Sequence, residues 1–316
     1  MTIGYIAASR SSRLALKQTE MVLDALAKLN KCNNFQVLKI KTAGDVDKRP
    51  IFSMDRKGVF EKEVNDSVLN GQADFGVHSL KDIPTDLHSE LLIASVPRRA
   101  DPRDVLVSKN KINLVNLTRG SKVGTSSLRR AVQIKRKNPG VEVIPIRGNV
   151  ETRIKKSLDG SYDAIVLAQA GLSRLGLEST IVERFRIRDF LPAPGQGAMA
   201  IVCRRDNRSI ISLLRKIEHL PSQIASDAER SLIRGIDTGC RFPVGALAKY
   251  DRESKNVHLT AKAFSIDGKK TLSVEKIGKG TRANEVGEAT AQWFIKNGIE
   301  EIAYGWRDAL NSWNKV

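Results

Sequence analysis

Two hydroxyl residues and two arginines open one predicted helix. A short strand ends at Gly124, and Thr125 and Ser127 follow it. Arg129 and Arg130 then lie in the first helical turn. The start of a helix presents unpaired N–H groups and the positive end of the helix dipole, so it attracts anions. Because two guanidinium forks add bidentate donors for carboxylate or phosphate, we expect an anion site here. A capped surface helix with solvated arginines is the structural alternative.

Arginines recur at the next two predicted strand ends. Arg147 follows a strand at 141–146, and Arg153 lies in the helix after it. Arg174 lies just beyond a strand at 164–168. Ligands of open α/β sheets bind at the carboxyl ends of strands, so these arginines are expected to converge on one cleft. Each charge-assisted hydrogen bond contributes roughly 1.5–3 kcal/mol, so several would hold a polycarboxylate without a metal. Taken singly, each arginine is also typical of a protein surface.

A lysine and an aspartate stand side by side after another predicted strand. Ser79 ends that strand, Lys81 and Asp82 follow it, and Pro84 closes the turn. A carboxylate beside a lysine stays ionised, so it is suited to stabilise a cation or to accept a proton. An ordinary ion pair at a turn is an equally good interpretation of the spacing alone.

Two further pairs are candidates for the same cleft. Arg10 and Ser12 follow the first predicted strand, where they either face the cleft or merely cap the next helix. Lys57 and Phe60 end a long polar stretch without periodicity, which is typical of a loop. That loop would close over a ligand, and the alternative is a solvated loop with no role.

One of the three cysteines has a reactive setting. Cys240 follows a predicted helix and lies next to Arg241, and a neighbouring cation favours the nucleophilic thiolate. An inert buried thiol is the alternative at this position. We interpret Cys32 and Cys203 as structural. The cysteines and the four histidines are too scattered for a disulfide framework or a His/Cys metal site, although a carboxylate-only metal site stays open.

The elements that position these residues alternate between strand and helix. In the first two thirds, alternation predicts parallel sheets covered by helices. The predicted strands there lie at 3–8, 35–41, 73–78, 105–108, 122–124, 141–146 and 164–168, and the predicted helices at 14–29, 59–69, 127–137 and 150–158. The last third predicts a small α+β domain with helices at 222–234 and 284–296 and strands at 244–249, 257–264 and 271–276. Proline and glycine mark hinges near 97–104 and 191–197.

Charge is the most informative part of the composition. The net charge is +18, and residues 98–200 contain 20 basic and 9 acidic residues, so that third of the chain carries +11. This concentration indicates an anionic partner: a nucleic acid, a membrane surface or a multiply charged small molecule. Aromatic residues make up only 5% and no nucleic-acid-binding motif is present, which disfavours a nucleic acid. No apolar run is long enough to span a bilayer and no signal peptide is recognisable, so we expect a cytoplasmic protein.

Five segments of the chain together resemble the porphobilinogen deaminase family. They occur in the family's order: VHSLKDIP at 77–84, VGTSSLRR at 123–130, IRGNVETR at 146–153, LPAPGQGA at 191–198 and GCRFPVG at 239–245. The resemblance implies an α/β fold of two domains like those of periplasmic binding proteins, with mostly parallel sheets around a cleft, and a small C-terminal α+β domain. The implied boundaries are 1–97 with 198–219, 98–197, and 220–316.

The resemblance also implies an activity in tetrapyrrole (heme) biosynthesis. Family members are transferases that deaminate four porphobilinogen molecules and polymerise them into hydroxymethylbilane on a dipyrromethane cofactor. A thioether would join this primer to Cys240, and Asp82 would be the catalytic carboxylate. The implied cofactor-binding residues are Ser79, Lys81, Thr125, Ser127, Arg129, Arg130 and Arg153. The implied substrate-binding residues are Arg10, Ser12, Lys57, Phe60, Arg147, Arg153 and Arg174.

Three residues depart from the family pattern without touching the reacting atoms. Ser53 replaces a loop lysine of some members, Ala43 replaces an arginine before a Gly-Asp pair, and Val202 replaces an acid. We expect a monomer with no nucleic-acid or membrane partner. The alternatives are a non-catalytic anion-binding protein of the same two-domain architecture and a nucleic-acid binder.

Overall fold

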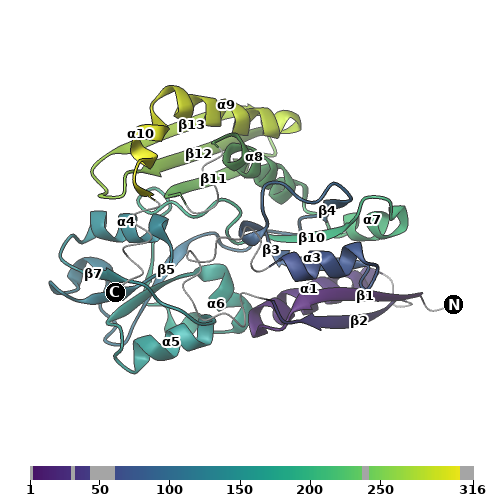
Figure 1. Cartoon of the computed structure of the whole chain (residues 1–316), viewed down its shortest axis with the longest axis horizontal. Helices are drawn as coiled ribbons and strands as arrows, with labels where there is room; N and C mark the ends of the chain where they lie inside the picture. The colour runs from purple at the N-terminus through teal and green to yellow at the C-terminus, as the bar shows by residue number, and fades with distance from the viewer. Residues whose placement is uncertain (1–2, 30–32, 43–60, 237–241, 307–316) are drawn as a thin grey trace.

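The computed structural model describes residues 3–29, 33–42, 61–236 and 242–306. Three units, each built on one sheet, surround the middle of the molecule (Figure 1). The N-terminal unit and the middle unit lie side by side, and the C-terminal unit lies across both of them. Among the described residues, no helix is long and apolar enough to cross a membrane.

The N-terminal unit has a five-stranded sheet in the order β2-β1-β3-β10-β4. Its strands are β1 (Ile3–Arg10), β2 (Asn33–Ile40), β3 (Phe75–Ser79), β4 (Leu91–Ser95) and β10 (Met199–Arg204). Its helices are α1 (Arg13–Leu29), α3 (Lys62–Leu69) and α7 (Arg208–Arg215). In α1 the buried positions Ala15, Gln18, Thr19, Val22 and Leu26 recur every three or four residues, which places one face of the helix on the sheet.

The middle unit repeats this plan in the order β7-β6-β8-β5-β9. Its strands are β5 (Asp104–Ser108), β6 (Lys122–Gly124), β7 (Glu142–Ile144), β8 (Ala164–Ala168) and β9 (Glu183–Arg184). Its helices are α4 (Leu128–Lys137), α5 (Val150–Leu158) and α6 (Gln169–Leu175). β8 is buried almost throughout, because helices or loops cover both faces of the sheet at its centre.

In each sheet four strands run in one direction, and one reversed strand lies between two of them. In the first sheet β1, β2 and β3 are parallel, and β10 runs antiparallel to β3. In the second sheet β6, β7 and β8 are parallel, and β5 runs antiparallel to β8. Each reversed strand is the first one after the chain crosses between the units. The expected parallel sheets are therefore confirmed for the strands whose ends carry the candidate site.

The chain crosses between the N-terminal and middle units twice, between β4 and β5 and again between β9 and β10. These two crossing segments lie against each other. Ala100 N–H donates to Gly197 O at 3.1 Å. Gly197 has a φ of +88°, and a Cβ there would lie 2.6 Å from Ala100 O. A larger residue would be strained in conformation and would push the segments apart. The predicted glycine-rich hinge is thus a close backbone contact.

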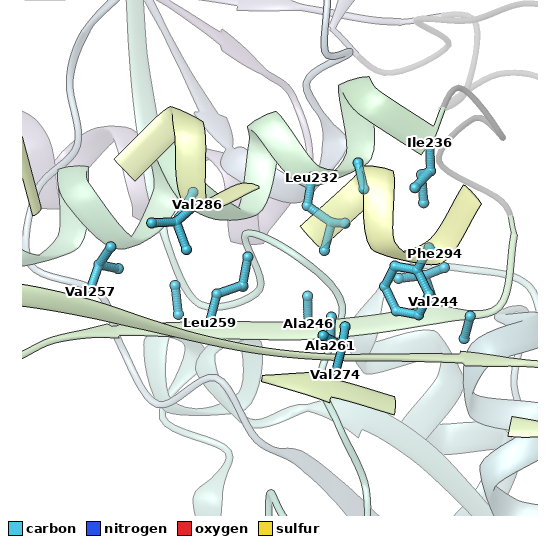
Figure 2. Close-up of a cluster of buried hydrophobic side chains, with 14 of the residues drawn as sticks. Leu232, Ile236, Val244, Ala246, Val257, Leu259, Ala261, Val274, Val286 and Phe294 are labelled. Atoms are coloured by element: carbon cyan, nitrogen blue, oxygen red, sulfur yellow. The ribbon is translucent and has the colours of Figure 1, made fainter. Parts of the chain in front are cut away.

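The C-terminal unit packs two long helices on an antiparallel sheet. Its strands are β11 (Val244–Tyr250), β12 (Asn256–Phe264) and β13 (Thr271–Lys279), and its helices are α8 (Leu220–Ile236), α9 (Ala283–Lys296) and α10 (Ile299–Ala303). Figure 2 shows Leu232 and Phe294 from the helices facing Ala246 and Ala261 of the sheet. This core fixes α8, which precedes the segment that contains Cys240.

Candidate functional site

The hydroxyl residues after β6 hold the start of α4. Thr125 is buried, and its Oγ1 accepts a hydrogen bond from Ser127 N–H at 3.2 Å. Ser127 is the N-cap of α4, and its Oγ accepts from Arg130 N–H at 3.5 Å. These contacts fix the backbone at the start of α4.

Arg129 and Arg130 are buried against a carboxylate from another strand. Arg129 Nη1 lies 2.7 Å from Asp104 Oδ2, and Arg130 Nη2 lies 2.7 Å from Asp104 Oδ1. The side chains of Arg129 and Arg130 are 4% and 8% exposed, and Asp104 is fully buried. The sequence pattern suggested arginines open to an anion, whereas the structure shows both arginines paired with one internal carboxylate. Buried charges need such partners, which explains the difference.

A glutamine from the second crossing segment completes this network. Gln196 Nε2 donates to Asp104 Oδ1 at 2.9 Å and to Pro102 O at 2.7 Å. Burial alone would raise the pKa of Asp104, but Arg129 and Arg130 outweigh it and lower that pKa to about 2. The carboxylate is therefore ionised at neutral pH and fixes two guanidinium groups beside both crossing segments.

Arg153 lies within electrostatic range of charged groups from both units. Its Nε donates to Gly148 O at 2.8 Å. Burial, together with neighbouring Arg130 and Arg147, lowers the pKa of Arg153 to about 10, against the opposing effect of Asp82. Asp82 from the N-terminal unit thus lies within electrostatic range of the arginines of the middle unit.

Arg174 approaches the same region from α6. Its Nη2 donates to Gly197 O at 2.7 Å, and burial lowers its pKa to about 10. The Nε atoms of Arg129 and Arg174 are buried without a hydrogen-bond partner in the part of the chain that the structure describes. An unmade hydrogen bond at a buried donor costs roughly 1–3 kcal/mol. Donors of this kind fit a group that carries several carboxylates.

The N-terminal unit contributes Lys81 and Asp82, whose side chains differ in exposure. Asp82 is exposed at the end of a 3₁₀ turn (Leu80–Asp82), while Lys81 is half-buried. Burial lowers the pKa of Lys81 to about 8, against the opposing effect of Asp82. Arg129, Arg130 and Asp104 of the middle unit also act on the pKa of Lys81, so these charged groups lie within electrostatic range of one another.

Polar contacts hold the remaining residues of this edge. Ser79 Oγ accepts from Gln18 Nε2 at 3.0 Å, and Ser12 Oγ caps α1 by accepting from Ala15 N–H at 3.4 Å. Burial, together with nearby Arg10, lowers the pKa of His78 to about 4. Ser12 thus has the plain capping contact that its sequence position suggested.

Direct contacts also join the two units. Arg13 Nη1 lies 3.4 Å from Glu151 Oε1, and Leu14 of α1 packs beside Gly171 of α6. The units therefore meet on both sides of the site, at the crossing segments and at the α1–α6 contact (Figure 1).

Some expected residues lie outside the described part of the chain. These are Cys240, Lys57, Phe60, Cys32, Ser53 and Ala43. Val202 is buried in β10. Cys203 is buried, and burial raises the pKa of its thiol to about 11, so it is inert as a nucleophile at neutral pH. No cluster of three possible metal ligands occurs among the described residues.

Sequence reasoning missed the acids that organise the hinge. Asp104 is one, and Glu229 of α8 is the other. Arg99 Nη1 lies 2.7 Å from Glu229 Oε1, and the Glu229 carboxylate also accepts from Gly195 N–H at 2.5 Å and Ala248 N–H at 2.7 Å. An acid next to an apolar run is the available sequence signal, but it does not identify the partner.

Comparisons with known proteins agree along nearly the whole chain. Residues 5–212 match the family model "Porphobilinogen deaminase, dipyromethane cofactor binding domain", and residues 224–296 match "Porphobilinogen deaminase, C-terminal domain". A probable porphobilinogen deaminase of Nitrosopumilus maritimus is 45% identical over 99% of each chain. A porphobilinogen deaminase of Desulforudis audaxviator is 39% identical over 94% of this chain and 96% of its own.

Solved structures give a weaker likeness. The methionine-binding protein MetQ has a TM-score of 0.44 at 12% identity, and covers 68% of this chain and 89% of its own. The Escherichia coli sulphonate-binding protein SsuA has a TM-score of 0.41 at 12% identity, over 93% and 87% of the two chains.

Proposed function

The chain belongs to the porphobilinogen deaminase family, and from this premise we propose how its residues divide the work. The protein is a hydroxymethylbilane synthase, a transferase of tetrapyrrole biosynthesis that deaminates porphobilinogen and joins four units on a dipyrromethane cofactor. The full-length match to the family is the observation that carries this function, and the facing strand ends support it.

Cys240 is the proposed anchor of the cofactor. When bound, the dipyrromethane supplies the terminal pyrrole to which new units are added. Its carboxylates fit the buried donor Arg129 Nε, which has no hydrogen-bond partner among the described residues. The thioether persists between cycles, so Cys240 is an anchor and not a turnover nucleophile.

Asp82 is the proposed catalytic residue. Its carboxylate is exposed at a strand end, beside the half-buried Lys81 and within range of Arg153. In this position the carboxylate would stabilise positive charge on a pyrrole ring and accept or return its proton. Few native contacts depend on this exposed side chain, so a role in the reaction fits Asp82 better than a role in stabilising the fold.

The positive side chains are the proposed holders of acetate and propionate groups. Arg129, Arg130, Arg153 and Lys81 serve the cofactor together with the O–H groups of Ser79, Thr125 and Ser127. Arg10, Ser12, Lys57, Phe60, Arg147, Arg153 and Arg174 serve the substrate. The Asp104 carboxylate offsets part of the repulsion between Arg129 and Arg130 before an anion binds.

The domain limits and the setting of the protein complete the proposal. The three domains comprise 1–97 with 198–219, 98–197, and 220–316. The protein works as a cytoplasmic monomer without nucleic acid or membrane. Porphobilinogen is its small-molecule partner, in line with the family name.

Incubation of the purified protein with porphobilinogen tests this function. We expect release of one ammonia for each unit consumed and formation of hydroxymethylbilane. A non-catalytic anion-binding protein would instead bind porphobilinogen reversibly and release no ammonia, and that outcome would refute the proposal.

A further inference from the structure

One arginine of the C-terminal unit binds three successive carbonyl groups of the N-terminal unit. Arg230 of α8 donates to Ile83 O at 3.3 Å through Nη1, and to Pro84 O at 2.8 Å and Thr85 O at 3.0 Å through Nη2. The donors and acceptors are about 146 residues apart in sequence. A planar guanidinium can serve several acceptors at once, which an ammonium on a single stem does less well.

These carbonyls directly follow Asp82. On the other side of Asp82, Leu80 N–H donates to Ala198 O at 3.0 Å, and the 3₁₀ turn closes by a bond from Ile83 N–H to Leu80 O at 3.2 Å. The catalytic carboxylate is thus carried by a short turn with two anchors. The first anchor is the sheet of its own unit, and the second is Arg230.

The neighbouring Arg234 makes a weaker version of this contact. Its Nη2 donates to Thr85 O at 3.1 Å and its Nε lies 3.4 Å from Asp86 Oδ1, but its side chain is 55% exposed. Exposed ion pairs contribute little. Arg234 is therefore a natural control, because it lies on the same helix and contacts the same segment.

We propose that Arg230 is a positioning residue that holds the Asp82 turn in its working place relative to α8. This inference rests on the proposed catalytic role of Asp82. Helix α8 is described to Ile236, and Cys240 follows four residues later in sequence, so the helix that holds the turn also leads to the anchor. Loss of Arg230 would leave Asp82 chemically intact but less well placed.

Kinetics of the cofactor-loaded variants test the proposal. We expect Arg230→Ala to lower kcat about 10–100-fold with little change in KM, because misplacement of a catalytic group by about 1 Å has this effect. Arg234→Ala should stay within about twofold of the parent. Intact mass before the assay should show equal cofactor loading in both variants. Equal kcat values for Arg230→Ala and Arg234→Ala would overturn the proposal.

A double-mutant cycle separates this proposal from the function on which it rests. If Arg230 acts through Asp82, then Arg230→Ala should have almost no further effect on the residual rate of Asp82→Asn. Independent, multiplying losses would refute the positioning role. Full activity of Asp82→Asn would instead refute the catalytic role itself.

Chemical rescue provides a readout that a merely structural role would not move. Arg230 lines a cavity of about 360 Å³ together with Thr85, Asp86, Ser226 and Asp227, so a small solute has access to the vacated position. Methylguanidinium, at concentrations that do not unfold the protein, should restore part of kcat in Arg230→Ala and have no such effect on Arg234→Ala. If Arg230→Ala does not fold, Arg230→Lys is assayed in its place, and a kcat equal to that of the parent would contradict the proposal.

Discussion

At the scale of single residues, the side chain proposed to act in the reaction and those proposed to bind differ in exposure. Asp82 is exposed, whereas Arg129, Arg130 and Asp104 are buried and paired. A catalytic proton carrier needs access to the substrate, and a binding arginine needs a fixed direction. The two kinds of residue should therefore respond differently to substitution.

Replacement of Asp82 should remove activity and leave the fold intact. For Asp82→Asn we expect turnover to fall by about 10²–10⁴-fold, the usual contribution of a positioned acid or base. Because the side chain is exposed, the thermal midpoint should stay within the change typical of surface substitutions. Steady-state kinetics and thermal unfolding of the same preparation measure both, and normal bilane formation by the variant would refute the role of Asp82.

Replacement of Asp104 should mainly lower the stability of the fold, because it leaves two buried arginines without their carboxylate partner. We expect Asp104→Asn to lower the free energy of unfolding by about 3–5 kcal/mol. Asp101→Asn is the control, since its pair with Arg103 is partly exposed and should contribute about 1 kcal/mol or less. Denaturant unfolding at neutral pH compares them, and equal midpoints would contradict the account of the network.

Lys81 should set a limit on activity at alkaline pH. Burial lowers its pKa to about 8, so the ammonium that we propose to hold carboxylates is charged below pH 8 and loses its charge as the pH rises through that value. We expect kcat/KM to fall with an apparent pKa near 8 in the parent. In Lys81→Arg this alkaline limb of the pH profile of kcat/KM should move to higher pH, because arginine stays protonated. An unchanged limb in Lys81→Arg would show that another group controls it.

At the scale of elements, local sequence patterns located most strands and helices. The helix at 150–158 and the strands at 122–124 and 164–168 are confirmed at the predicted bounds. Strand β10 was missed, although the hinge before it was predicted. Its pairing with β3 depends on how the chain returns from the middle unit, and no local pattern encodes that return.

The site was predictable only in part for the same reason. Strand-end residues such as Arg147 and Asp82 follow from the rule that parallel strands place their carboxyl ends together. The partners of buried charges do not follow from it. Asp104 is 25 residues from Arg129, and Arg230 is about 146 from Pro84. Only the folded chain brings these residues into contact.

The hinge should depend on Glu229, which joins α8 to both crossing segments. Its buried carboxylate pairs with Arg99, and removing one partner of such a pair typically costs about 3–5 kcal/mol. We expect Glu229→Gln to lower the free energy of unfolding by about this amount. Glu285→Gln, in an exposed pair with Arg282, is the control and should cost about 1 kcal/mol or less. Similar unfolding curves for the two variants would contradict the role of the hinge.

At the scale of the whole molecule, the charge suits a lengthening polyanion. Residues 98–200 carry +11 of the net charge of +18, and Arg153 in this part of the chain lies within electrostatic range of Asp82. Each porphobilinogen brings two carboxylates, so the product chain becomes more anionic as it grows. A protein that holds it through several steps needs fixed positive groups, and the proposed anchor at Cys240 would keep the primer from leaving with the product.

The intact mass of the purified protein tests this account most directly. The protein is expressed in cells that make porphobilinogen, and its mass is compared with the mass calculated from the sequence. The account predicts an excess equal to one dipyrromethane group, which is absent from Cys240→Ala and retained in Cys203→Ala if that variant folds. A protein that converts porphobilinogen while its mass equals that of the bare polypeptide, or a Cys240→Ala variant that keeps the excess, would contradict it.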